Sequence, residues 1–124
     1  MSPAVHPRRH PDAGSVTVHA LWVAAVLVGL VALGLQVTSL VALRHRVASA
    51  ADLAALAGSR AATEGADGCA AARDVARLNG VRVHRCRMDL DVATVTAVGS
   101  TRPWWGGTWT TRIDARAAPA WYER

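Results

Sequence analysis

Residues 16–43 form a long apolar segment, and this segment most constrains what the chain can fold into. It is 28 residues long, and its part from 20 to 35 contains no polar side chain. A helix needs about 20 residues to cross a hydrocarbon layer of roughly 30 Å, so the segment is long enough to cross with some tilt. The sequence therefore predicts a helix that stays in a membrane.

Two other roles for the apolar segment are a signal peptide and a buried core helix. The apolar part of a signal peptide is usually about 7–15 residues long and ends at a small-residue cleavage site. The segment here is about twice that length, and the Ala-rich sequence after Arg46 continues it as a helix. A core helix would need apolar sequence elsewhere to cover it, and a chain of 124 residues has little.

Charge and motifs argue against nucleic-acid binding and against catalysis. All 14 basic Lys and Arg residues are Arg, spread along a chain of formal charge +5 without a run of five or six. There is no Gly-rich phosphate loop, paired-carboxylate site or His-rich metal helix. We therefore predict a protein that is not an enzyme, with no cofactor, no metal, no nucleic acid and no small-molecule substrate.

Cys69 and Cys86 are the only cysteines. Two lone cysteines after a membrane span predict a disulfide in an oxidising compartment. Zinc is the alternative, but His84 raises the nearby ligands to three, and closed structural sites take four. A bridge over this loop would add about 3 kcal/mol in the chain-entropy model, which is a large share for a small, Ala-rich domain.

Four regions follow from these patterns. Residues 1–13 are a basic cytoplasmic arm with three prolines, and residues 14–43 are the transmembrane helix. Residues 44–64 continue this helix outside the membrane, since they are good helix formers without proline. Residues 65–124 form a small disulfide-linked α+β domain.

Helix ends and packing faces are also predicted. Ser15 is expected to cap the long helix, and Gly65 to end it. The continuation carries a ladder of small residues, Ala50, Ala54 and Gly58, which allows close approach of a second helix. The ladder therefore favours packing beside another subunit.

Asp52 stands among these alanines and has two interpretations. It is either an exposed carboxylate on a water-facing stripe, or the partner of Arg44 or Arg46 from another helix. In the second case the ion pair would fix the register of the two helices.

The last region predicts one helix and three antiparallel strands. The helix covers residues 66–79, with Asp67 as its cap and Ala71, Val75 and Leu78 on one side. The strands cover residues 81–88, 92–101 and 108–117. The inward face of the second strand is ambiguous, because its valines fall on both parities. In the third strand the inward residues alternate cleanly; they are Trp109, Thr111, Ile113, Ala115 and Ala117.

The turn before the last strand, "PWWGGTW", holds Trp104, Trp105 and Trp109. These side chains pack under the hairpin, contact a protein partner or dock on the membrane surface. Trp121 and Tyr122 are candidates to join the same aromatic patch.

Three features resemble the TadE/TadG-like proteins of Tad (Flp-type) pilus and secretion systems, and most closely a small actinobacterial branch named after a neighbourhood of helicase and secretion genes. They are "GSVTV" at the start of the apolar helix, "RHRVASAADLAALAGS" directly after it, and "CAAARDVARLNGVRVHRC" leading to "RIDARAAPA", and they extend over residues 14–119. The signature residues of the second feature are Arg44, Arg46, Ala50, Ala51, Asp52, Ala54 and Gly58.

The resemblance implies a pseudopilin-like subunit with a cytoplasmic N-terminus, one membrane crossing and a small exterior domain. Its partners would be the membrane, other TadE/TadG-like or pilin-like subunits, and secretion machinery. A prepilin peptidase would cut between Gly14 and Ser15, behind Arg8 and Arg9. His19 stands where such subunits usually carry a Glu, so a plain helix start at Gly14 is the alternative.

Orientation does not follow from charge, since Arg residues flank both ends of the span. We expect the N-terminus in the cytoplasm, because the cysteines need an oxidising space and because the resembling family has this orientation. Two other functions stay open. One is a free-standing bitopic envelope protein that binds a partner through its Trp-rich hairpin, and the other is a small secreted protein that has lost its apolar segment.

Overall fold

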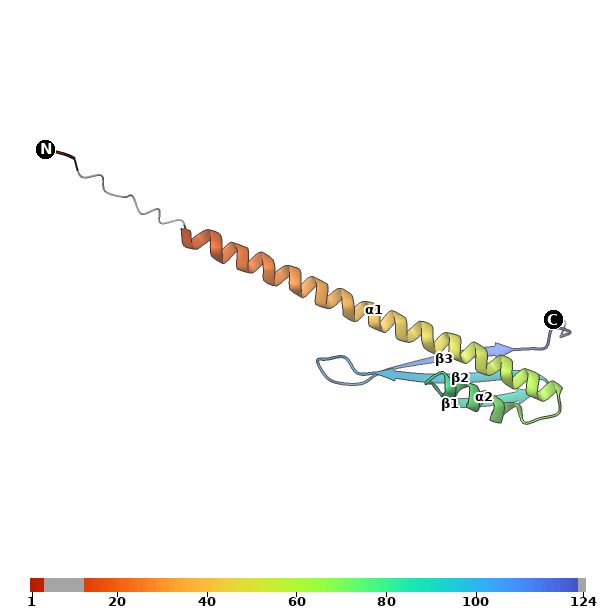
Figure 1. Ribbon diagram of the computed structural model, residues 1–124. Helices are drawn as coiled ribbons and strands as arrows, with labels where there is room; N and C mark the ends of the chain where they lie inside the picture. Colours follow the sequence, from red (N-terminus) through yellow and green to blue (C-terminus); the bar gives the residue numbers. More distant parts are fainter. Residues whose placement is uncertain (4–12, 123–124) are drawn as a thin grey trace. The chain divides into compact units, whose positions relative to one another are not determined.

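The computed structural model describes residues 1–3 and 13–122, so most of the expected basic arm lies outside the described residues. The fold is of the α+β class, as predicted, with two helices followed by three strands (Figure 1). The elements are α1 (Ala13–Thr63), α2 (Gly68–Leu78), β1 (Arg82–Asp89), β2 (Val92–Thr101) and β3 (Trp109–Ala117). The chain divides into two compact units, Met1–Gln36 and Val37–Arg124.

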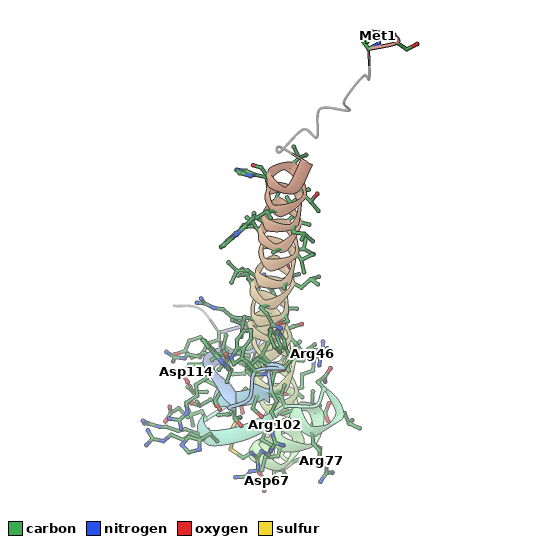
Figure 2. All side chains as sticks on the ribbon, turned by 90° about the vertical axis from the view of Figure 1, so that its left-hand side faces the viewer. Met1, Arg46, Asp67, Arg77, Arg102 and Asp114 are labelled. Carbon is green, nitrogen blue, oxygen red and sulfur yellow. A yellow bond between two sulfur atoms is a disulfide. The ribbon has the colours of Figure 1, made fainter. Side chains whose placement is uncertain are left out.

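The first unit contains the apolar part of α1. Every large apolar side chain from Val16 to Leu35 is at least half exposed, and the sticks along this part of the helix are almost all carbon (Figure 2). A continuous apolar surface of this kind is unusual for a soluble monomer. By length and composition, α1 is the one helix among the described residues that could cross a membrane.

The ends of α1 differ in how well they were predicted. The helix begins at Ala13, so Ser15 lies within the first turn and the predicted cap at Ser15 is wrong. At the other end, Gly65 has a φ of 76°, and the N–H of Ala66 donates to the carbonyl of Ala61 at 2.8 Å. This is a glycine-terminated helix end, as predicted.

The three strands form one antiparallel sheet in the order β1-β2-β3. Each strand lies within one residue of its predicted bounds. β1 and β2 are joined by a tight turn at Leu90 and Asp91, and β1 has an irregularity between Val83 and Arg85.

The inward face of the sheet is set by the odd-numbered residues of β2. Its buried members on that parity are Ala93, Val95, Ala97 and Gly99. β3 alternates as predicted, with Ala115 buried and with Ile113 and Ala117 half-buried, but Trp109 at its start is exposed. Of the valines that made the sequence ambiguous, Val95 lies on this inward parity, and Val92 at the start of the strand is buried on the other.

The second half of α1 packs on this sheet face. A β-carbon on Gly58 would lie 3.2 Å from the β-carbon of Ala93, and one on Gly99 would overlap Val47. β2 therefore runs antiparallel to α1, with Ala93 opposite Gly58 and Gly99 opposite Val47. The core between them is made mostly of small side chains; its buried helix residues are Val47, Ala50, Ala51, Ala54 and Ala55.

The packing face of α2 differs from the predicted one. Its buried residues are Gly68, Ala72 and Ala76, whereas Leu78 is 84% exposed, so the predicted face of Ala71, Val75 and Leu78 is wrong. The small residues face inward because α2 approaches α1 and β1 closely: a β-carbon on Gly68 would lie 2.6 Å from the carbonyl oxygen of Gly58.

Candidate interaction surfaces

The small-residue ladder of α1 faces the chain's own domain. Ala50, Ala51 and Ala54 are at most 2% exposed, and Gly58 contacts the backbone of Gly68. The expectation that this ladder packs beside another subunit is therefore wrong for this face. The small residues do allow a close approach, but it is the chain's own sheet and α2 that pack on them.

The side of α1 that remains open carries different residues. Asp52, Leu53 and Leu56 are exposed there. Arg44 and Arg46 are exposed as well. Among the described residues, the ion pairs lie within α2 and within β1, so Asp52 forms no ion pair with another described residue. This leaves the carboxylate and both arginines accessible to a partner.

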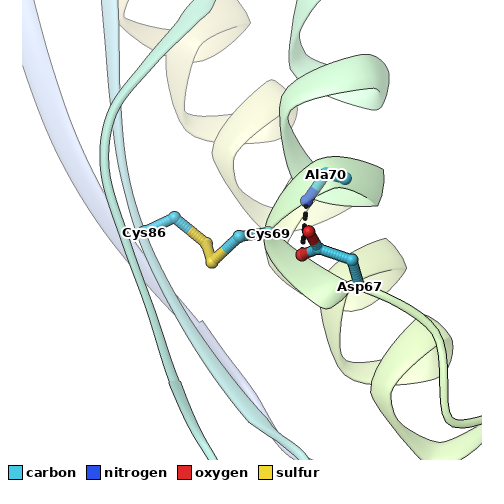
Figure 3. Close-up of a disulfide and its surroundings, with 4 residues drawn as sticks. All are labelled: Asp67, Cys69, Ala70 and Cys86. Carbon is cyan, nitrogen blue, oxygen red and sulfur yellow. Dashed lines mark hydrogen bonds between the residues drawn. A yellow bond between two sulfur atoms is a disulfide. The ribbon is translucent and has the colours of Figure 1, made fainter.

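A disulfide joins α2 to the sheet. Cys69 and Cys86 are bonded, with an S–S distance of 2.07 Å and a Cα–Cα distance of 5.8 Å (Figure 3). Next to the bridge, the Ala70 N–H donates to Oδ1 of Asp67 at 3.0 Å, which confirms Asp67 as the helix cap. No group of His, Cys, Asp and Glu in the described part of the chain could hold a metal ion.

Residues 102–108, together with Trp109, form an exposed aromatic turn between β2 and β3. Trp104 is 77%, Trp105 50% and Trp109 49% exposed. The rings of Trp104 and Trp105 meet edge to face, with centroids 5.8 Å apart. The turn depends on Gly106 and Gly107, whose φ angles are 94° and 83°. With so much indole surface open, packing under the hairpin does not account for these residues.

Trp121 does not join the aromatic turn. Trp109 pairs with Thr101 at one end of β3, whereas Ala117 pairs with Ala93 at the other. Trp121 follows this second end and lies beside Leu56 and Thr63 of α1. The expected single aromatic patch is therefore wrong, and the two Trp sites stand at opposite ends of the domain.

The outer face of the sheet carries a cluster of arginines that the sequence reasoning missed. All of them come from β1 and β3, and each pairs with Thr94, Thr96 or Val98 of the central strand β2. The arginines are exposed, and they are Arg82, Arg85 and Arg87 from β1 and Arg112 and Arg116 from β3. Near Val98, a shallow hollow of about 340 Å³ is lined in part by Arg82, His84 and Arg112. The signal was Arg at every second position, at 85 and 87 and again at 112 and 116 with Asp114 between them, which a count of basic runs overlooks. Arg82 shares their face only through the irregularity between Val83 and Arg85.

The proposed cleavage point lies at the start of α1. Gly14 and Ser15 are helical and exposed, and Nδ1 of His19 donates to the Ser15 carbonyl at 3.1 Å. Arg8 and Arg9 lie outside the described residues. Comparisons of the chain with protein-family models, with curated proteins and with solved structures yield no match.

Proposed function

We propose that the chain is a TadE-like, pseudopilin-like single-pass membrane subunit of a Tad/Flp-type pilus or secretion assembly. The observation that supports this most is the double use of α1. Its residues 16–35 expose an apolar surface, and its residues 47–59 are the spine on which a small α+β domain packs. A subunit of this kind acts by packing, and we propose no catalytic step for it.

The surfaces available for assembly are the span and the open side of α1. Apolar side chains in lipid associate through van der Waals packing, with small residues at the contacts, and Ala25 and Gly29 offer such a pair within the span. Outside the membrane, Leu53 and Leu56 offer apolar contacts, and Asp52 offers an ion pair with an arginine of the next subunit.

We propose that the N-terminus is cytoplasmic and the domain extracytoplasmic. The disulfide supports this orientation, because such bonds persist in oxidising compartments. An impermeant maleimide applied to intact cells tests it, with a cysteine introduced at Leu90, which is exposed in the β1–β2 turn. Labelling of intact cells is expected, and labelling only after lysis would contradict the orientation.

Photo-crosslinking in the membrane tests the function itself. A photoreactive residue at Leu56 and another at Val28 should yield adducts with pilin-like or secretion-system subunits, identified by mass spectrometry. The matched control is the same residue at Leu78, which is exposed and belongs to α2 instead of α1. Adducts from Leu78 but none from Leu56 or Val28 would contradict assembly through α1.

A free-standing bitopic protein remains the second candidate, because the aromatic turn is exposed and such surfaces bind partners. It predicts protein adducts from Trp105 and none from Val28. The mass of the mature protein then separates the remaining cases: a start at Ser15 indicates prepilin processing, an intact N-terminus a plain membrane protein, and loss of the whole apolar segment a secreted one.

A further inference from the structure

We propose that the aromatic turn docks in the headgroup layer of the same bilayer that α1 crosses. This inference rests on the proposed membrane anchoring of α1, and it assigns to the turn a lipid surface as its binding partner. The docking would give the exterior domain a second attachment beside the helix.

The packing register places the turn at the membrane end of the domain. Ala93 lies opposite Gly58 and Gly99 opposite Val47, so six residues of strand span eleven residues of helix. A strand rises about twice as far per residue as a helix. Each residue of β2 beyond Gly99 therefore corresponds to about two residues of α1, counted back from Val47 toward its N-terminus. Thr101 and its partner Trp109 reach the level of helix residues near 43, and the turn extends further in the same direction.

This level is where the apolar span ends. Residues 37–43 are the last mainly apolar residues before Arg44, so they lie near the boundary between hydrocarbon and headgroups. Trp104 and Trp105 reach the same depth from the side of the sheet. Trp is enriched at this boundary, where an apolar ring meets a polar N–H environment.

The charges around the turn suit a phospholipid surface. Arg102 begins the turn and is exposed. The hollow lined by Arg82 and Arg112 lies at the same end of the sheet, since Val98 is part of its lining and precedes Gly99 by one residue. Long arginine side chains reach toward phosphates while their stems stay on apolar surface. Aromatic side chains that enter the membrane interface, together with arginines that reach the lipid phosphates, can anchor a protein segment to the bilayer surface.

Trp fluorescence of the full chain, reconstituted in phosphatidylcholine–phosphatidylglycerol vesicles, tests the docking. Three variants each keep Trp in one region and replace the others with Phe. The turn reporter keeps Trp104, Trp105 and Trp109; the span reporter keeps Trp22; the distal reporter keeps Trp121. Lipids carrying a spin label near the headgroup quench nearby indoles. Intact-mass analysis of the Cys69–Cys86 bond checks that each variant has folded.

The expected result is quenching of the turn reporter about twofold or more above that of the distal reporter, with a blue-shifted emission. Trp22 should also be quenched by lipid-borne labels. If Trp22 is quenched but the turn reporter behaves like the distal one, the docking is wrong and the anchoring stands. If Trp22 is not quenched, the anchoring is wrong, and the docking fails with it.

A second measurement uses the unaltered chain, in case the Phe variants do not fold. A photoactivatable phosphatidylcholine in the same vesicles labels the segments that touch lipid, and mass spectrometry locates the label. The peptide that contains Trp104 should carry label, and the peptide that contains Trp121 should not. Equal labelling of the two peptides, or no label on the peptide that contains Trp104, would overturn the proposal.

Discussion

Gly68 sits directly on the backbone of Gly58, so that a β-carbon on Gly68 would lie 2.6 Å from the Gly58 carbonyl oxygen. The two glycines set the distance at which α2 crosses α1. Met88 of β1 also packs against Gly68, since a β-carbon on Gly68 would lie 2.9 Å from the Met88 sulfur. Three elements therefore meet where no side chain fits.

Gly68→Ala is expected to destabilise the α+β domain by about 1–3 kcal/mol, because backbone has to move to admit the new carbon. Urea-dependent proteolysis of the full chain in mild detergent measures this. Gly29→Ala is the matched control, since a β-carbon there meets nothing within 4 Å. Equal stability of the two variants would show that the contact is looser than described.

Gly99 and Val47 are expected to behave as a coupled pair. Gly99→Ala alone places a carbon on the Val47 side chain and should cost about 1–3 kcal/mol. Val47→Ala alone leaves a cavity and should also destabilise. The double variant should be more stable than the sum predicts, by about 0.5–3 kcal/mol. Strict additivity in the same unfolding assay would contradict the register of β2 on α1.

Ser59 ties α1 to the β1–β2 turn. Its Oγ donates to the carbonyl of Asp91 at 2.7 Å, and its side chain is 2% exposed. Ser59→Ala leaves that carbonyl without its donor and should cost about 1–3 kcal/mol. Thr63→Ala is the control, because its bond to Arg60 is local and exposed, and a change within about 0.5 kcal/mol is expected there. Similar costs for both would argue against a structural role for Ser59.

Loss of the disulfide should weaken the domain by about 3 kcal/mol, mainly through the unfolded chain. The comparison is urea unfolding with and without reductant for the native chain and for the variant with Cys69→Ala and Cys86→Ala. Reductant should lower the midpoint of the native chain and leave that of the variant unchanged. If reductant left the urea midpoint of the native chain unchanged, the disulfide would add nothing to stability.

Local signals in the sequence predicted the elements well. Gly65 ends α1 because glycine adopts the positive φ that such an end needs. Asp67 caps α2 because its carboxylate accepts a bond from an otherwise unpaired N–H. The Val- and Thr-rich strand lies at its expected position, and the two cysteines form the predicted disulfide.

Burial was predicted less well, because helical spacing defines a face but not what covers it. In an Ala-rich chain the inward residues are those that permit close approach, which is why Ala72 is buried and Leu78 exposed. The same limit explains the error over the small-residue ladder, which packs against the chain's own sheet and not against another subunit. The arginines of β1 and β3 came together only through strand pairing, which no single segment reveals.

The account depends most on α1 remaining in the membrane with an oxidised domain attached. Cell fractionation with alkaline extraction of the membranes, followed by non-reducing intact-mass analysis, measures both properties at once. We expect a protein that retains residues 16–43, stays in the extracted membranes and carries the Cys69–Cys86 bond. Recovery of the full-length chain from the soluble fraction, with both thiols reduced, would contradict it.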